Sequence, residues 1–323
     1  MAGCELCCVQ KAVKLLLLLL LMSATRSGAE LVEEDPLSLT YHNGPLLTTS
    51  SPLDVHLIWY GNFSAVQRSV VADFVQSLGA DVAANGAQQP SVSAWWTTTR
   101  GYTEASNEAP VAATRLAEQR LDEAYSRGKA LQRSDVAALV EAAVHSEALP
   151  GSTTAAAAVY LVLTSEDVVV ERFCISSCGF HATVANGDKL QPYAWVGNAE
   201  SQCPGQCAWP FHQPLYGPQT TPLVAPNGDV GIDGMIINIA TVLAGSVTNP
   251  FNTGYFQGDA TAPLEAVSAC PGIYGKGAYP GFPGQLPVDS VTGASYNAHG
   301  INGRKFLLPA IWDPASRSCK TIL

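Results

Sequence analysis

The chain has 323 residues, of which 47% are hydrophobic and 14% are charged, so it can build one large domain or two closely packed lobes. Acidic residues outnumber basic ones by 27 to 17, which gives a formal net charge of −10. Phosphate backbones and anionic membranes repel so acidic a chain, and we therefore exclude nucleic acid as a partner.

The first 29 residues are organised as a secretory signal peptide. Lys11 and Lys14 precede a short apolar run, Leu15–Leu21, and the small residues Ser-Gly-Ala at 27–29 form a cleavage site. The run is shorter than the roughly 20 residues that cross a bilayer, although a retained anchor is the alternative. We predict a mature chain of residues 30–323, with no membrane span, in the extracellular space, apoplast or cell wall.

The first half of the mature chain, residues 30–170, is predicted to be rich in strands and helices. A buried strand is expected at Val55–Tyr60, and a helix follows at Val66–Leu78, opened by a capping box of Ser64 and Gln67. Further along, we predict a strand at Trp95–Tyr102, amphipathic helices at Val111–Ser126 and Ser134–Ala148, and a central strand at Ala158–Thr164.

The second half, residues 171–323, is rich in Cys, Gly and Pro. Short strands are predicted at Gly179–Val184 and Tyr193–Gly197, and ordered loops at 203–228 and 270–302. One helix begins near Asp233 and ends before Pro250, and its stretch from Asn238 onward carries no acid, base or thiol. The two halves together predict an α+β fold class, in which the helix packs and the loops recognise a partner.

Six cysteines remain after the predicted cleavage, all of them in the second half. An even number of cysteines in an oxidising compartment predicts disulfides, although six cysteines allow fifteen pairings. We favour pairing among the first four and a bond between the last two, with a four-thiolate zinc site as the alternative for the first four. The six residues are Cys174, Cys178, Cys203, Cys207, Cys270 and Cys319.

Two histidines and one carboxylate are candidates for a metal site: His181 lies near Cys178, His212 lies near Cys207, and Asp229 precedes the central helix. A lone histidine is more often a hydrogen-bonded packing residue, and a carboxylate at a helix start acts as a cap. We therefore predict no metal and no cofactor. These three residues remain the ligand set of one alternative, a divergent metal-dependent hydrolase.

Motifs of covalent catalysis and nucleotide binding are missing from the sequence. No G-x-S-x-G, P-loop or G-x-G-x-x-G pattern occurs in a suitable context, so no catalytic residue is predicted. Trp195 and Trp209 could stack on sugars, or they could pack in the core and against the disulfides. Asn62, in Asn-Phe-Ser at the turn between the first strand and helix, is the predicted glycosylation site.

Long strings of residues resemble the plant EXORDIUM / phosphate-induced protein family. This resemblance implies a plant extracellular protein connected with growth responses, including brassinosteroid-promoted cell expansion, without a known catalytic activity. The strings are YHNGPLL from Tyr41, VHLIWYGNFS from Val55, SVSAWW from Ser91, CAWPFHQPLYGPQ from Cys207, PNGDVGIDGMI from Pro226, TNPFNTGYFQGD from Thr248 and ASYNAHGINGRKFLLPAIWDP from Ala294.

The central helix also resembles a degenerate zincin helix, the metallopeptidase element that carries His-Glu-x-x-His or His-Glu-x-x-Glu. Aligning its Thr-Asn-Pro ending places Thr241, Val242 and Gly245 where the ligands and the general base would stand, and none can bind zinc. We therefore predict a growth regulator that acts by binding an extracellular protein or wall polysaccharide. The alternatives are the metal-dependent hydrolase and a wall carbohydrate-binding protein.

Overall fold

The computed structural model describes residues 37–49, 51–80, 88–146 and 157–323. Residues 37–323 form one compact unit. The predicted signal peptide, residues 1–29, and the predicted helix end at Ala148 lie outside the described residues.

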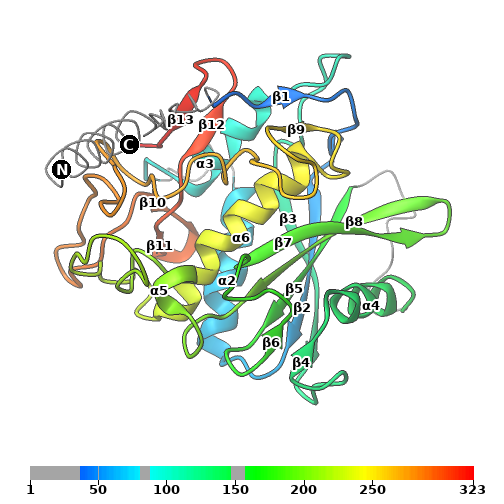
Figure 1. Cartoon of the computed structure of the whole chain (residues 1–323), viewed down its shortest axis with the longest axis horizontal. Helices are drawn as coiled ribbons and strands as arrows, with labels where there is room; N and C mark the ends of the chain where they lie inside the picture. Colours follow the sequence, from blue (N-terminus) through cyan, green and yellow to red (C-terminus); the bar gives the residue numbers. More distant parts are fainter. Residues whose placement is uncertain (1–36, 50, 81–87, 147–156) are drawn as a thin grey trace, which may run out of the picture. The chain divides into compact units, whose positions relative to one another are not determined.

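A five-stranded sheet with the strand order β3-β2-β5-β8-β7 stands at the centre of this unit (Figure 1). Four strands are parallel, and β7 runs antiparallel to β8 at one edge. A parallel sheet is normally covered on both faces, and every residue of β5 is buried accordingly. The strands are β2 (Leu53–Tyr60), β3 (Thr114–Asp122), β5 (Ala158–Thr164), β7 (Gly179–Asn186) and β8 (Lys189–Gly197).

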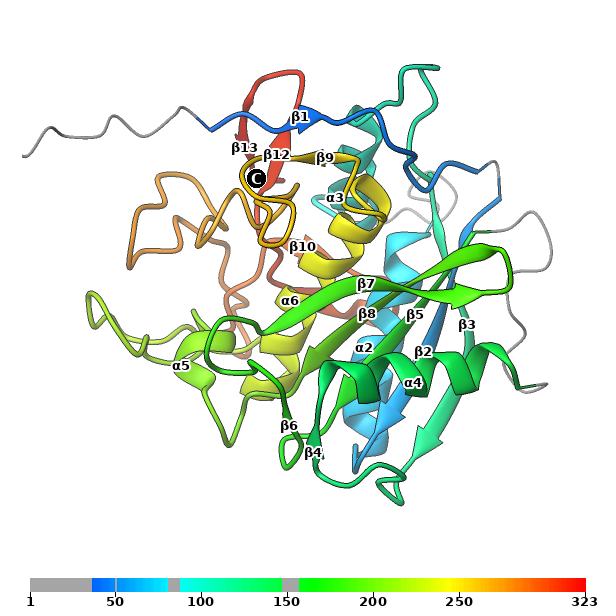
Figure 2. The same ribbon diagram turned by 45° about the vertical axis from the view of Figure 1, so that its right-hand side comes forward.

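Helices lie on both faces of the sheet (Figure 2). Successive side chains of a strand point to opposite faces, and β2 therefore contributes to two cores. Its residues Leu57 and Trp59 join the core that contains α2 (Ala65–Leu78) and α6 (Val230–Thr248). Ile58 and Tyr60 join the core on the other face, with α4 (Arg133–Val144).

Short elements complete the unit and tie distant segments together. The strand pairs are β1 (Thr40–Tyr41) with β9 (Tyr255–Phe256), β4 (Ala130–Leu131) with β6 (Val169–Val170), β10 (Ala298–His299) with β11 (Lys305–Phe306), and β12 (Ile311–Asp313) with β13 (Ser318–Lys320). The short helices are α3 (Val92–Thr97), η1 (Thr98–Gly101), α5 (Pro204–Cys207) and η2 (Ile301–Gly303).

Several predicted elements are confirmed, with differences of at most four residues at the ends that the structure describes. The strand predicted from Val55 is β2, and the helix after it is α2, whose capping box of Ser64 and Gln67 is formed on both sides. The helix predicted near Ser134 is α4, and the central strand is β5. The two short strands predicted in the second half belong to β7 and β8, and α6 is the predicted central helix.

The strand predicted at Trp95–Tyr102 is wrong, because this segment is helical. The side chain of Ser91 accepts a hydrogen bond from the Ala94 amide and so caps α3. Both tryptophans are buried, and Trp95 Nε1 donates to the Pro309 carbonyl at 2.6 Å. The aromatic residues that resembled a strand therefore serve a core-facing helix.

The helix predicted at Val111–Ser126 is also wrong, because residues Thr114–Asp122 form the edge strand β3. This strand pairs in parallel with β2, and most of its residues are exposed or only half-buried. Charged side chains are common on edge strands, and here they gave a spacing that also fits an amphipathic helix. Pairing with β2 decides the outcome, since backbone hydrogen bonds to a buried strand outweigh weak local propensity.

All six described cysteines form disulfides, with the pairs Cys174–Cys203, Cys178–Cys207 and Cys270–Cys319. The first four pair among themselves and the last two pair with each other, as predicted. The four-thiolate zinc alternative is therefore wrong, because a disulfide sulfur has no thiolate to offer a metal. Three disulfides are typical of proteins in oxidising compartments, which indicates an extracellular protein.

Candidate functional site

The central helix α6 packs within the core for almost its whole length. It is long and apolar enough to cross a membrane, but 83% of its apolar window is buried inside the protein, as in a core helix. Asp229 caps it by accepting a hydrogen bond from the Ile232 amide at 2.8 Å. The hydroxyl of Thr241 donates to the Ile237 carbonyl in the turn before, so it is used within the helix. The sequence predicts a packing role for this helix, and its apolar side chains are buried, among them Ile236, Ile237, Ile239, Val242 and Leu243.

The N-terminal half of α6 lies directly against the loop that follows α5. A Cβ atom at Gly234 would lie 2.6 Å from the Cβ of Ala208 and 3.1 Å from the Cys207 carbonyl oxygen. One turn later, Asn238 Nδ2 donates to the same Cys207 carbonyl at 2.9 Å. The small residue and the amide therefore fix the start of the loop that carries Trp209.

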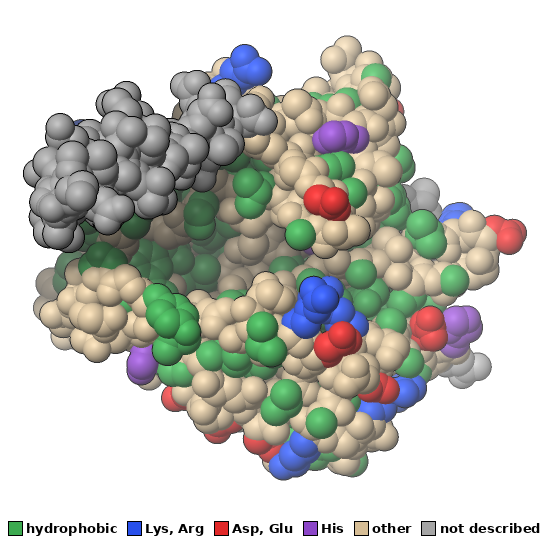
Figure 3. All heavy atoms as spheres, in the orientation of Figure 1, with side chains coloured by type: hydrophobic (Ala, Val, Ile, Leu, Met, Phe, Trp, Pro, Cys, Tyr) green, Lys and Arg blue, Asp and Glu red, His purple; other side chains and the backbone are tan. Residues whose placement is uncertain are grey.

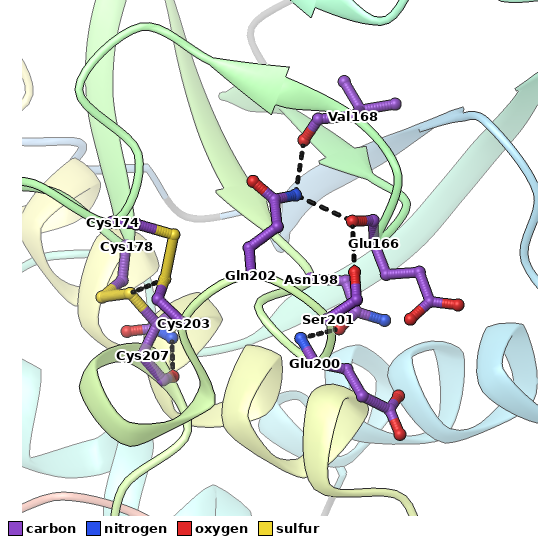
Figure 4. The surroundings of a disulfide bond; sticks show 11 residues. Glu166, Val168, Cys174, Cys178, Asn198, Glu200, Ser201, Gln202, Cys203 and Cys207 are labelled. Atoms are coloured by element: carbon purple, nitrogen blue, oxygen red, sulfur yellow. Dashed lines mark hydrogen bonds between the residues drawn. A yellow bond between two sulfur atoms is a disulfide. The ribbon is translucent and has the colours of Figure 1, made fainter. Parts of the chain in front are cut away.

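Two disulfides and a group of hydrogen bonds hold the other side of this region, as Figure 4 shows. Gln202 Nε2 donates to the carbonyls of Glu166 and Val168 at 2.8 and 3.0 Å, and Ser201 Oγ donates to the Glu166 carbonyl at 2.9 Å. The segment before α5 is thereby tied to the turn after β5. Loops held in this way present their side chains in fixed positions.

An apolar groove, which we call the aromatic groove, lies between two of these loops. One wall consists of Trp209, Pro214 and residues 216–218, and the other consists of residues 271–273 and 278–281. Its volume is about 580 Å³, which is within the range of small-ligand sites. Figure 3 shows hydrophobic side chains gathered in a hollow on the side where Figure 1 draws these loops.

The walls of the aromatic groove carry rings but no charged side chain. Tyr216 is 83% exposed and Tyr279 is 64% exposed, although both are large apolar residues. The ring of Trp209 packs 5.7 Å from that of Tyr274, and the ring of Tyr279 packs 5.2 Å from that of Phe282. Exposed aromatic rings around an apolar groove are typical of recognition surfaces.

A half-buried hydrogen-bonded pair, His181 with Glu265, lies against the C-terminal half of α6. His181 Nε2 is 2.9 Å from both carboxylate oxygens of Glu265, and Asn249 Nδ2 donates to the same carboxylate at 2.7 Å. A Cβ atom at Gly245 would lie 2.7 Å from Glu265 Oε2 and 2.9 Å from His181 Nε2. Gly245 therefore leaves the room that this pair occupies.

The three residues of the predicted metal alternative have three separate environments. His181 is paired with Glu265, a ring nitrogen of His212 is 3.0 Å from the Gln213 carbonyl, and Asp229 caps α6. Across the ranges that the structure describes, no group of three His, Cys, Asp or Glu residues could hold a metal ion. The structure does not bring these candidates together.

The two tryptophans that were candidates for sugar stacking differ. Trp195 lies on β8, is fully buried and donates from Nε1 to Thr164 Oγ1, so it belongs to the core. Trp209 lines the aromatic groove. The sequence did not lead us to Tyr216 and Tyr279. A signal was present, because each lies beside Gly and Pro, in PLYGP and GAYPG. Such segments form loops, and a tyrosine ring in a loop is often exposed.

A second cavity, of about 590 Å³, lies near the end of α2 and contains His299, Arg304 and Lys305. Its cations are already paired, Arg304 with Asp73 and Lys305 with Asp289. Burial and the nearby Lys305 lower the pKa of His299, which favours its neutral form. We therefore regard the aromatic groove, whose ring tips have no hydrogen-bond partner among the described residues, as the stronger candidate site.

Asn62 lies at the exposed turn between β2 and α2, and its Nδ2 donates to the Tyr125 hydroxyl at 3.1 Å. Its glycosylation stays a prediction.

At the start of α6, Asp233 is buried and accepts hydrogen bonds from the amide and side chain of Asn227. Burial raises its pKa from 3.8 to about 7, although these hydrogen bonds act in the opposite direction.

Comparison with known proteins covers nearly the whole described unit. Residues 39–322 match the family described as the phosphate-induced protein 1 conserved region. The chain belongs to the EXORDIUM / phosphate-induced protein family. It is 53% identical over 311 residues to Protein EXORDIUM-like 2 of Arabidopsis thaliana, a match that covers 95% of this chain and 97% of the relative.

Two further relatives of this family are 48% identical to the chain. Protein PHOSPHATE-INDUCED 1 of Nicotiana tabacum matches 93% of both chains, and Protein EXORDIUM of Arabidopsis thaliana matches 96% of this chain and 98% of its own. Neither name is that of an enzyme. No solved structure matches the chain.

Proposed function

We propose that this member of the EXORDIUM family is a secreted protein of the apoplast or cell wall that regulates growth and cell expansion by binding, in connection with brassinosteroid responses. The observation that carries this proposal is the aromatic groove, an exposed apolar site on disulfide-held loops. Relatives at 48–53% identity, none of which bears the name of an enzyme, support the family, and three disulfides support the compartment. Removal of residues 1–29 during export is part of the proposal.

The side chains of α6 at the positions of a zincin active site support binding over catalysis. We interpret α6 as the degenerate counterpart of a zincin helix, with Thr241, Val242 and Gly245 at the positions of the lost groups. The Thr241 hydroxyl is bonded within the helix, Val242 is buried, and Gly245 faces the pair of His181 and Glu265. None of these groups can activate water, because that requires an open ligand position or a free base.

The test uses secreted protein in a plant cell expansion assay. The double variant Tyr216→Ser/Tyr279→Ser removes two exposed rings from the aromatic groove, so it should be secreted normally and lose its effect on expansion. Val291→Ser is the matched control, since Val291 is 92% exposed and does not line the groove. Full activity of the double variant would refute binding through the groove. N-terminal sequencing of the same material checks for cleavage near Glu30.

Wall carbohydrate binding is the second candidate, because the aromatic groove offers rings on which sugars can stack. Next to the groove, another cavity shares Pro214 with it and is lined in part by Gln206 and Gln213. Pull-down with insoluble wall polysaccharides, with and without the two tyrosine substitutions, tests this candidate.

Elemental analysis of untagged protein tests the hydrolase alternative, which requires stoichiometric metal.

A further inference from the structure

The polar tips of the aromatic groove are the starting point for identifying its ligand, an inference that rests on the proposed function. The groove has three such tips on side chains, Trp209 Nε1 and the hydroxyls of Tyr216 and Tyr279. None of the three has a hydrogen-bond partner among the described residues. An indole N–H only donates, and each phenol hydroxyl can donate. The groove therefore offers donors on an apolar, uncharged surface.

The donors of the groove fit a ligand that presents hydrogen-bond acceptors better than one that presents hydroxyl groups. Proline has no backbone N–H, so a proline-rich segment presents carbonyl acceptors and apolar rings without donors that need a partner. Such segments form the polyproline II helix before they bind, and they dock in aromatic-lined grooves at a low cost in conformational entropy. The geometry points to a proline-rich peptide in the polyproline II conformation as the ligand of the aromatic groove.

A neutral oligosaccharide fits the groove less well. Each sugar ring carries several hydroxyls, and each hydroxyl that is buried needs both to donate and to accept. The groove has no carboxylate, amide or guanidinium side chain to meet that demand. A buried hydroxyl without a partner is costly, and this cost opposes the gain from stacking. Sugar binding at the groove is accordingly the competing outcome of the test.

The rigidity of the groove supports recognition of a preformed helix. Trp209 packs against Tyr274, whose hydroxyl is 3.4 Å from the Trp209 carbonyl, and the loop before Trp209 is fixed by Asn238 and the bond between Cys178 and Cys207. Trp209, whose ring is already in place, loses little side-chain entropy on binding. Binding of a peptide that is also preformed then requires little ordering on either side.

The experiment measures binding of a synthetic oligoproline peptide to the full secreted protein by calorimetry, with a glycine–serine peptide of equal length as the negative probe. Tyr216→Phe/Tyr279→Phe keeps both rings and removes both hydroxyls, and the affinity should fall about two- to tenfold for each lost hydrogen bond. Tyr125→Phe is the control, because the Tyr125 hydroxyl bonds Asp167 away from the groove. It should leave the affinity unchanged.

Three results would overturn the inference: no binding of oligoproline, binding that ignores the two Phe substitutions, or binding of a neutral wall oligosaccharide that depends on them in place of oligoproline. The growth assay separates this failure from that of the proposed function. If the Ser double variant loses growth activity and oligoproline does not bind, the inference falls and the proposed function stands. If oligoproline binds as expected and the Ser variant keeps full activity, the peptide site stands and the proposed function falls.

Discussion

Replacing Gly234 by Ala tests how tightly α6 determines the loop of the aromatic groove. In an unobstructed helix this change would stabilise the protein by about 0.5–1 kcal/mol, because Ala has the higher helix propensity. Here the new Cβ would lie 2.6 Å from the Cβ of Ala208, 2.8 Å from its Cα and 3.1 Å from the Cys207 carbonyl oxygen. Overpacking of this kind costs about 1–3 kcal/mol, and two of the three atoms are backbone that yields little.

The balance of the two effects at Gly234 is an expected loss of up to about 2.5 kcal/mol, to be measured by urea denaturation of the secreted protein. Thr241→Ala, on the same helix, is the control and should change stability by less than about 0.5 kcal/mol, because its lost hydroxyl bond is offset by better helix propensity. Adding Ala208→Gly to Gly234→Ala removes the nearest contact and should restore part of the loss. A Gly234→Ala protein that is more stable than the native chain would refute the reasoning.

Four further predictions concern burial, titration, cross-linking and modification. Leu243→Asp should abolish secretion in an export assay, because an unpaired carboxylate in the core costs several kcal/mol; normal export would contradict the packing role of α6. The raised pKa of Asp233 means that the folded state binds its proton more tightly, so its contribution to stability falls by up to about 4 kcal/mol as the pH rises from about 4 to about 7. Asp233→Asn should flatten that part of the profile in urea melts, and an unchanged slope would be evidence against it. Replacing Cys270 and Cys319 by Ser should cost about 4 kcal/mol in the same melts, since the bond closes a loop with a sequence separation of 49; an equal midpoint would show that the bond adds nothing. Asn62→Gln should lower the mass of secreted protein by one N-glycan, and an unchanged mass would show that the site is empty.

The sequence predicted those elements whose local signals and tertiary partners agree. The capping box before α2, the apolar run of β5 and the Pro that ends α6 each specify one structure, and each is found. The segments at 95–102 and 111–126 were wrong because local composition opposed the tertiary contacts. The tryptophans of the first are buried by a capped helix, and the second is an edge strand only through its pairing with β2.

The candidate site was only partly predictable from the sequence. Recognition on disulfide-held loops was expected, and Trp209 was among the candidate residues. The wall of the aromatic groove opposite Trp209 lies more than sixty residues further along the chain, and no sequence periodicity links the two segments. The pair of His181 and Glu265 likewise spans a separation of 84 residues, so only the folded chain shows that His181 has an acid as its partner.

The two walls of the aromatic groove are fastened by different covalent bonds. Cys207, bonded to Cys178, lies two residues before Trp209, and Cys270, bonded to Cys319, directly precedes Pro271. An isolated loop peptide therefore lacks both fastenings, and we expect the full-length protein to display the groove only after both bonds have formed. Binding of the ligand would then show that both disulfides of this chain have formed during export. Because each wall has its own disulfide, substitutions in one wall leave the bond that holds the other wall intact.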